Sequence, residues 1–385
     1  MRRLHATLPV AAVIFAGSLV SLQGCSTSIV PASSGSAPAS APAVGNAAVT
    51  STALDAAVNR FMKANKIQAG QLAVVKNGKL LFSHAYTNST DPKYPKTSPG
   101  SIMRIASESK AFSYIAGLQV VSDGLVSPTA AVFPYLKVTK PLLRSQKPDP
   151  NVNSITVSEL LSSTSGITGE EPAPDPAGPG PVRMAELGAK NTGPLSIDQF
   201  NRYLYGYQLA SPPGTQTNLL TNAGYYTIDR VVERAAKKPY WTYIQTKFLT
   251  PIGIHDAVLT RTAKSLRHAG EVTYDSTITN YSVLAPRSTA MVPCPYGGNF
   301  LFEVIDNSAV AISTQSYAKF IDKYYSPNYK TYSYWTGYMC GTSSYTAFEA
   351  GHSTYSFTFN NTVEEFLPSD PFVAQVAKLV KKLYN

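Results

Sequence analysis

The sequence is poor in the residue types that hold metal ions. It has five histidines and three cysteines among 385 residues, and none of them forms a His-x-x-x-His or Cys-x-x-Cys pair. A glycine-rich phosphate-binding loop is also absent. These absences argue against a metal centre and against a nucleotide site, so we expect no metal and no cofactor.

Strongly charged segments are missing as well. Only 15% of the residues are charged, and the lysines and arginines behind the net charge of +10 are scattered, without a basic run or stripe. Proteins that bind nucleic acid usually concentrate their positive charge on one face or helix. We therefore exclude nucleic acid as a partner and interpret the charge as a surface suited to anionic lipids or envelope polymers.

The one notable apolar run lies at the N-terminus. Residues 8–20 are mostly apolar, follow Arg2 and Arg3, and are too few for a comfortable transmembrane helix. The run leads into "LQGC", which resembles the bacterial lipobox, where the cysteine is lipidated. We predict a signal peptide over 1–24 and a lipid anchor at Cys25, so that the protein is exported and faces the periplasm from a membrane of the cell envelope. A plain signal peptide cleaved nearby is the alternative.

Cysteine use agrees with export. Setting Cys25 aside leaves Cys294 and Cys340, an even pair in an oxidising compartment, for which we predict a disulfide; two buried thiols are the alternative.

Residues 25–52 are rich in Ser, Ala and Pro and carry no charge, which predicts a flexible tether. The remaining residues, 53–385, are enough for one large domain.

The order of patterns predicts an α+β fold. Two strand-like runs flank Asn77-Gly78, a dipeptide typical of a type I′ hairpin turn. Helical periodicity follows over 108–122, and strand and helix patterns return near the C-terminus. We predict an antiparallel sheet made from both chain ends and flanked by helices, with a mostly helical insertion over roughly 125–290. Within it, the Pro- and Gly-rich loop 167–195 is expected to form a lid or wall.

A Ser-x-x-Lys pair, Ser107 and Lys110, follows an extended approach at the predicted start of a helix. Residues three apart share a helix face, so the lysine can reach the serine hydroxyl. Burial and the positive end of the helix dipole would lower the pKa of the lysine and let it take the serine proton. A second pair with this spacing, Ser316 and Lys319, lacks that context, and we interpret it as a surface pair.

Several motifs in order resemble one family of serine hydrolases. The region "PGSIMRIASESKAFSYIAGLQVVSDGL", the helix "ITVSELLSSTSGI" and the segment "PPGTQTNLLTNAGYYTIDRVVERAAKKPYW" are similar to class C β-lactamases, penicillin-binding proteins and esterases of that fold. The similarity is good from about 54 to 257 and loose beyond. It implies a nucleophile at Ser107 with Lys110 as its base.

The remaining family motifs are incomplete here. In place of Tyr-x-Asn stand Leu220 and Asn222; the resemblance implies that Asn222 bonds Lys110 and substrate, although it could simply cap the next helix. The third motif, Lys-Thr-Gly or His-x-Gly, is best matched by His352 to Thr354, with a threonine at the glycine position. That alignment implies an oxyanion donor at the N–H of Tyr355. The alternative is an ordinary strand histidine.

These features predict an exported serine hydrolase acting on a small ester, amide or peptide substrate through an acyl-enzyme. The alternative is a catalytically impaired relative that binds a ligand or envelope partner. A third possibility, the nucleophile elbow of α/β-hydrolases at "GHSTY", has little support because a tyrosine replaces its last glycine and no histidine follows Ser353.

Overall fold

The structure, a computed structural model, describes residues 48–167, 175–215, 221–363 and 365–385. Residues Thr50–Asn385 form one compact unit. The predicted signal peptide, Cys25 and nearly all of the predicted tether lie outside the described residues, and so does Leu220. Among the helices that are described, none is both long and apolar enough to cross a membrane.

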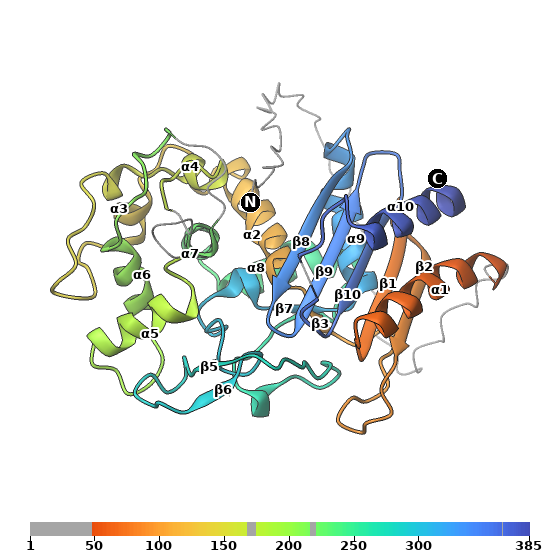
Figure 1. Ribbon diagram of the computed structural model, residues 1–385. Helices are drawn as coiled ribbons and strands as arrows, with labels where there is room; N and C mark the ends of the chain where they lie inside the picture. The colour runs from red at the N-terminus through yellow and green to blue at the C-terminus, as the bar shows by residue number, and fades with distance from the viewer. Residues whose placement is uncertain (1–47, 168–174, 216–220, 364) are drawn as a thin grey trace, which may run out of the picture. The chain divides into compact units, whose positions relative to one another are not determined.

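The first two strands of this unit and the last three form a five-stranded antiparallel sheet (Figure 1), in the order β2-β1-β10-β9-β8. This confirms the predicted α+β fold, with a sheet made from both chain ends. The strands are β1 (Ala69–Lys76), β2 (Lys79–Thr87), β8 (Ser333–Met339), β9 (Thr342–Phe348) and β10 (Thr354–Phe359).

The predicted hairpin joins β1 to β2. Asn77 and Gly78 have φ angles of +52° and +75°, and the residues on either side, Lys76 and Lys79, are paired. Positive φ at both central positions is what a type I′ turn requires, and glycine and asparagine adopt it most easily. The turn therefore fixes the register in which β1 meets β2.

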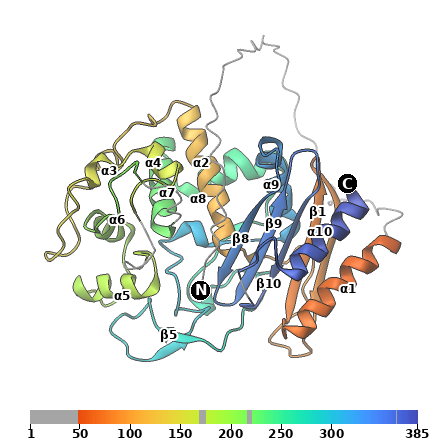
Figure 2. The same cartoon turned by 45° about the horizontal axis from the view of Figure 1, so that its top comes forward.

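Helices α1 (Ala48–Ala64) and α10 (Pro371–Tyr384) lie side by side on one face of the sheet (Figures 1 and 2). Their apolar residues and the rings of β9 and β10 form one core cluster. Within it, the rings of Phe61 and Phe372 stack at 4.1 Å, and Phe357 meets Phe372 edge-on at 5.0 Å. This packing joins the two ends of the domain.

The other face of the sheet carries buried hydroxyl groups. Thr346 donates to Ser356 at 2.7 Å, and Thr314 of helix α9 (Thr314–Tyr324) donates to Thr358 at 3.1 Å. All four side chains are almost completely buried, and their hydrogen bonds satisfy polar groups that would otherwise be costly there. The candidate nucleophile region packs next to this polar layer.

A mostly helical part follows the sheet's first hairpin. Helix α2 (Lys110–Ser122) is followed by α3 (Val132–Leu136), α4 (Val157–Leu161), α5 (Pro179–Gly188), α6 (Ile197–Tyr205), α7 (Asn222–Ala236) and α8 (Tyr240–Ile244). Short 3₁₀ or π turns are η1 (Ala106–Ser109), η2 (Val152–Ser154), η3 (Gln245–Leu249), η4 (Thr250–Ile252), η5 (Lys264–Leu266), η6 (Asp306–Ser308) and η7 (Ser326–Asn328). The aromatic and aliphatic side chains of these helices make up the largest core cluster.

Two small sheets complete the unit. One has the order β3-β7-β4 and consists of β3 (Met103–Arg104), β7 (Val310–Ile312) and β4 (Val258–Leu259); the other pairs β5 (Thr279–Tyr281) with β6 (Met291–Pro293). The predicted disulfide between Cys294 and Cys340 is confirmed. Since Cys294 follows β6 and Cys340 lies in the turn between β8 and β9, the bond ties the smaller ribbon to the edge of the main sheet.

Candidate active site

Ser107 lies where a strand turns into a helix. The chain leaves β3, turns at Ala106 and continues through η1 into α2. Ala106 has a φ of +48°, a left-handed conformation that costs a residue other than glycine about 1–2 kcal/mol. Such conformations concentrate at functional sites, where the surrounding structure enforces them. Ser107 is the second residue of η1, so its N–H belongs to the first turn, where donors have no partner inside the helix.

Arg104 holds the strand that leads to this turn. It is almost completely buried, its Nε donates to Glu271 at 3.2 Å, and its Nη1 donates to the carbonyl of Pro295 at 2.7 Å. The guanidinium also lies over the ring of Tyr274, 4.3 Å from the centroid. A buried arginine needs this many partners to offset desolvation. The segment before Ser107 is therefore fixed on both sides.

The structure brings the two residues of the predicted catalytic pair together. The Nζ of Lys110 lies 2.7 Å from the Oγ of Ser107. Burial lowers the pKa of Lys110 to about 8, against the opposing effect of the Asp175 and Asp229 carboxylates, which favour the ammonium form. About a tenth of Lys110 is therefore a neutral amine at pH 7, and about half at pH 8. The amine has a lone pair that accepts the serine proton.

Asn222 connects this pair to the helical part. It is the first residue of α7, and its Oδ1 accepts from Lys110 Nζ at 2.6 Å and from Ser308 Oγ at 3.2 Å. Its main-chain N–H and its Nδ2 both donate to Oδ2 of Asp175, at 2.9 and 2.8 Å. Its carbonyl accepts from Asn307 Nδ2 at 2.9 Å. The predicted contact between Asn222 and Lys110 is thus present.

A buried ion pair fixes the turn that carries Asn307 and Ser308. Arg230 of α7 donates to Asp306, the first residue of η6, and also bonds Glu233 at 2.8 Å. Asp229, next to Arg230, is completely buried, and burial raises the pKa of its carboxyl well above the usual range. The ion pair thereby holds the turn whose Asn307 and Ser308 bond Asn222.

The residue directly after the candidate nucleophile is also buried. Burial raises the pKa of Glu108 to about 8, although the hydroxyls of Ser344 and Thr346 oppose the shift. Among the described residues, neither carboxyl oxygen has a hydrogen-bond partner of normal geometry. Glu108 is therefore mostly protonated at neutral pH, because ionisation would leave an unpaired charge in the polar layer beneath η1.

The strand that faces the nucleophile turn is β8. A Cβ built on Gly337 would lie 2.1 Å from the carbonyl oxygen of Ile105, so only glycine lets the two main chains approach this closely. Ser344, paired with Gly337 across the hairpin, donates to the same carbonyl at 3.0 Å. The sequence Trp335-Thr336-Gly337 therefore lies beside the nucleophile turn, and it contains a Thr-Gly dipeptide preceded by tryptophan.

This geometry corrects the predicted third motif at His352 to Tyr355. Tyr355 lies on β10, an interior strand, where it is paired with Val74 on one side and Ala347 on the other, and its hydroxyl bonds that of Tyr332 at 2.9 Å. Its N–H therefore lies between strands and not on a free edge, so the expected oxyanion donor at Tyr355 is wrong. His352 is exposed in the turn before β10. The sequence order misled here, because hairpin β8–β9 had no strong turn signal.

Tyr225 of α7 brings an aromatic ring close to the pair. Its ring centroid lies 6.0 Å from Lys110 Nζ, which is a contact with the ring and not a hydrogen bond from the hydroxyl. Tyr203 and Tyr205, which stand near Leu220 in the sequence, are buried in the helical core.

The sequence did not reveal Asp175, Ser308 and Gly337 as residues of the site. Of these, only Gly337 belongs to a recognisable pattern, the Thr-Gly dipeptide at 336–337.

Ser316 and Lys319 lie apart from this network. Both are partly exposed on α9, and the N–H of Ser316 donates to Ser313, the residue that caps the helix. The second pair therefore occupies partly exposed positions on a capped helix whose other side is buried.

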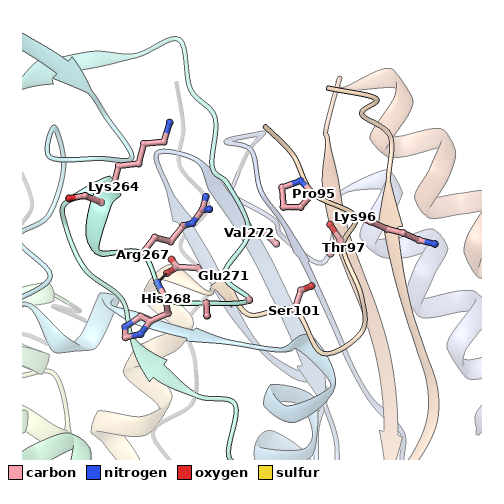
Figure 3. Close-up of a pocket in the computed structure, with 12 residues that line it drawn as sticks. Pro95, Lys96, Thr97, Ser101, Lys264, Arg267, His268, Glu271 and Val272 are labelled. Carbon is pink, nitrogen blue, oxygen red and sulfur yellow. Dashed lines mark hydrogen bonds between the residues drawn. The ribbon is translucent and has the colours of Figure 1, made fainter. Parts of the chain in front are cut away.

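A cleft of about 620 Å³ lies elsewhere, between residues 95–101 and 264–272 (Figure 3). Lys264 and Arg267 stand on one wall, and Thr97 and Ser101 on the other (Figure 3). Ser107 is not among the described residues that line it. The cleft borders the segment that leads into β3, and it is distinct from the candidate active site.

The family model described as Beta-lactamase matches residues 54–322. The chain belongs to the β-lactamase family. The match covers every residue of the Ser107, Lys110 and Asn222 network, including Asp175 and Ser308. It ends before β8, which agrees with the loose resemblance of the C-terminal third and with the uncertain position of the third motif in the sequence.

Individual members of the β-lactamase family are distant relatives of the chain. Protein flp of Staphylococcus aureus (strain COL) is 24% identical over 215 residues, or 56% of this chain and 39% of flp, so the chain spans well under two thirds of that relative's length. The β-lactamase/D-alanine carboxypeptidase of Yersinia pestis has a TM-score of 0.60 at 16% identity, covering 89% of this chain and all of the other. EstCE1, a hydrolase with promiscuous acyltransferase activity, has a TM-score of 0.58 at 14% identity and coverages of 86% and 98%. These structures share the fold.

Proposed function

We propose that the protein is a serine hydrolase that cleaves small ester or amide substrates through an acyl-enzyme on Ser107, with Lys110 as the base. The observation that carries the proposal is the 2.7 Å contact between Lys110 Nζ and Ser107 Oγ, together with a Lys110 pKa that burial lowers to about 8. Burial disfavours the charged form of a lysine, so placing Lys110 against a serine hydroxyl would not stabilise the fold. A role in catalysis accounts for this position.

In the first half-reaction the Ser107 hydroxyl gives its proton to the Lys110 amine while Oγ bonds to the substrate carbonyl carbon. The carbonyl oxygen becomes an oxyanion. When the tetrahedral intermediate collapses, the bond to the leaving group breaks, and the leaving alcohol or amine takes the proton from Lys110. Water then attacks the acyl-enzyme, giving one proton to Lys110; collapse releases the acid and returns that proton to Ser107.

Two main-chain N–H groups are suited to hold the oxyanion. One is the N–H of Ser107, in the first turn of η1. The other is the N–H of Tyr338, which follows Gly337 on β8. Among the described strands, β8 is at the edge of the main sheet, so the backbone groups on its outer side are not paired with another strand of that sheet. Donors of this kind act where charge develops and typically contribute about 10²–10³-fold to the rate.

The substrate class follows from the groups around the pair. On β8, the side chain nearest to Gly337 on the same face of the strand is that of Trp335. Its ring packs edge-on against the ring of Tyr325, with the centroids 5.8 Å apart. A tryptophan at this position brings no positive charge that would attract a carboxylate, which favours a neutral acyl group over a substrate with a free carboxylate. Proteins of this fold include EstCE1, a hydrolase with promiscuous acyltransferase activity, and the β-lactamase/D-alanine carboxypeptidase of Yersinia pestis, so the proposal covers both esters and amides.

The proposed location is the periplasmic side of the cell envelope, with a lipid on Cys25. The Cys294–Cys340 disulfide supports it, since such bonds persist in oxidising compartments. Radioactive palmitate should label the wild-type protein and not Cys25→Ala. Equal labelling of both would contradict the anchor.

Hydrolysis of a p-nitrophenyl ester series tests the activity. The wild type should turn over short acyl esters, Ser107→Ala should abolish turnover, and Lys110→Ala should reduce it by at least about 10³-fold. Ser316→Ala is the matched control and should keep full activity, because Ser316 is a partly exposed residue of α9 that bonds Ser313 and lies apart from the Ser107 network. No turnover of any ester, amide or peptide by the wild type would instead favour the ligand-binding alternative.

A further inference from the structure

The amide group of Asn222 must point one way for the proposed chemistry to work. Its Oδ1 faces the donors Lys110 Nζ and Ser308 Oγ, and its Nδ2 faces Oδ2 of Asp175 at 2.8 Å. Rotation of the amide by 180° would turn Nδ2 towards the lysine and Oδ1 towards the carboxylate. The contact with the carboxylate would then be repulsive, and so would the contact with the ammonium form of Lys110.

Asp175 is the residue that makes the reversed orientation unfavourable. The same oxygen, Oδ2, accepts both the side-chain Nδ2 and the main-chain N–H of Asn222, so the acceptor is fixed relative to the start of α7. Asp175 is itself held in place: its Oδ1 accepts from the N–H of Ala177 at 2.9 Å, and its carbonyl accepts from Gly178 at 2.8 Å. The carboxylate also lies at the positive end of the α7 dipole.

We propose that Asp175 is a positioning residue for the reaction: it holds the Asn222 amide so that Oδ1 faces Lys110, and it thereby couples the segment before α5 to the catalytic pair. This inference rests on the proposed function of Ser107 and Lys110. It assigns a role to a loop that the sequence alone suggested as a lid or wall, and it gives the lysine a means of alignment where Leu220 stands in place of the motif's tyrosine.

A purely structural role would leave a different signature. If Asp175 only capped α7, asparagine would serve nearly as well, since Asn and Asp are equally good capping residues. Its charge, however, favours the ammonium form of Lys110. Removing that charge while keeping an acceptor oxygen separates the two roles, because stability should change little while the titration of Lys110 moves.

The experiment compares Asp175→Asn with the wild type in the full chain. The titration of Lys110 is followed by NMR of protein carrying ¹³Cε-labelled lysine, with the resonance assigned by its absence in Lys110→Ala. The rate of labelling of Ser107 by a fluorophosphonate is measured against pH. We expect the Lys110 midpoint to fall by about one unit, the size of effect of one neighbouring charge. The plateau labelling rate should fall about tenfold, because an asparagine at position 175 can present either its oxygen or its NH2 group and no longer enforces one orientation of the Asn222 amide.

Asp149→Asn is the matched control. Asp149 is another loop aspartate of the helical part that accepts main-chain N–H groups, from Asn151 at 2.8 Å and Leu209 at 3.4 Å, without touching Asn222. It should keep the wild-type midpoint and plateau. Asp175→Ser, which keeps a capping oxygen without charge, is measured in parallel in case the asparagine variant is unstable, and it must move the midpoint in the same direction.

An unchanged Lys110 midpoint in both Asp175 variants, or an equal change in Asp149→Asn, would overturn the proposal. The NMR readout needs no activity, so the two hypotheses fail separately. If wild-type Ser107 does not react with the fluorophosphonate, the proposed hydrolase function is contradicted, whereas a shifted Lys110 titration would still support the contact through Asn222.

Discussion

Gly337 lies directly against Ile105: a Cβ at position 337 would be 2.1 Å from the Ile105 carbonyl oxygen. Ile105 is two residues before Ser107, so this contact sets the distance between β8 and the nucleophile turn. Atoms at this separation cannot coexist, and the backbone around the turn must move when a side chain is added.

Gly337→Ala is therefore expected to impair the site. The methyl group should push η1 away from β8, which separates the two proposed oxyanion donors and lowers kcat/KM for a p-nitrophenyl ester by at least about 10²-fold. Gly78→Ala provides a control, because a Cβ at that position would have no atom within 4 Å, and it should affect stability through its turn without affecting the catalytic rate of folded protein. Wild-type kcat/KM in Gly337→Ala would contradict the assignment of β8.

The pH profile should report the titration of Lys110. Because the amine form is the base and burial lowers the Lys110 pKa to about 8, kcat/KM should rise with pH and level off above about 8. If Lys110 acted as a cation instead, kcat/KM would fall as the pH rises through about 8. The measurement is the initial rate at low substrate concentration, followed from mildly acidic to mildly alkaline pH.

Glu108 should make the protein less stable as pH rises through the neutral range. Its pKa is raised to about 8 in the folded protein from a usual value near 4.5, so between these values the folded state binds more protons than the unfolded state. The free energy of unfolding should therefore fall as pH rises from about 4.5 to 8, by up to about 1.4 kcal/mol per pH unit. The lowered pKa of Lys110 acts in the opposite direction: above about pH 8 it makes the free energy of unfolding rise with pH.

Urea unfolding of Glu108→Gln checks this expectation. Glutamine keeps the shape without the charge, so the contribution of Glu108 to the decline should be absent. Asp198→Asn, a change at an exposed carboxylate, should keep the wild-type slope. A slope in Glu108→Gln equal to that of the wild type would contradict a buried neutral carboxyl.

How far the sequence predicted the site depended on distance along the chain. Ser107 and Lys110 are three residues apart at a helix start, so local geometry alone brings them together. The hairpin at Asn77-Gly78 was likewise local, and it is present. The position of the third motif was not a local feature, because the strand that borders η1 is determined by the order of the strands in the main sheet. Asp175 was also beyond prediction, since its role arises only when a loop folds back onto α7.

The disulfide should stabilise the domain more than it affects catalysis. Cys294 and Cys340 are 46 positions apart, for which chain entropy predicts about 4 kcal/mol of stabilisation. Cys294→Ser with Cys340→Ser should lower the free energy of unfolding by roughly this amount and keep ester hydrolysis within about threefold at a temperature where the protein is folded. A loss of activity without loss of stability would instead give the bond a role in shaping β8.

The central claim is that Ser107 forms the acyl-enzyme with Lys110 as its base, and one measurement tests it most directly. The full chain is treated with a fluorophosphonate, and the adduct is located by peptide mass mapping in the wild type, Ser107→Ala and Lys110→Ala. The account predicts one adduct per chain on Ser107, no adduct in Ser107→Ala, and labelling slowed by about 10³-fold or more in Lys110→Ala. An adduct on another residue, or labelling of Ser107 that is unchanged without Lys110, would contradict it.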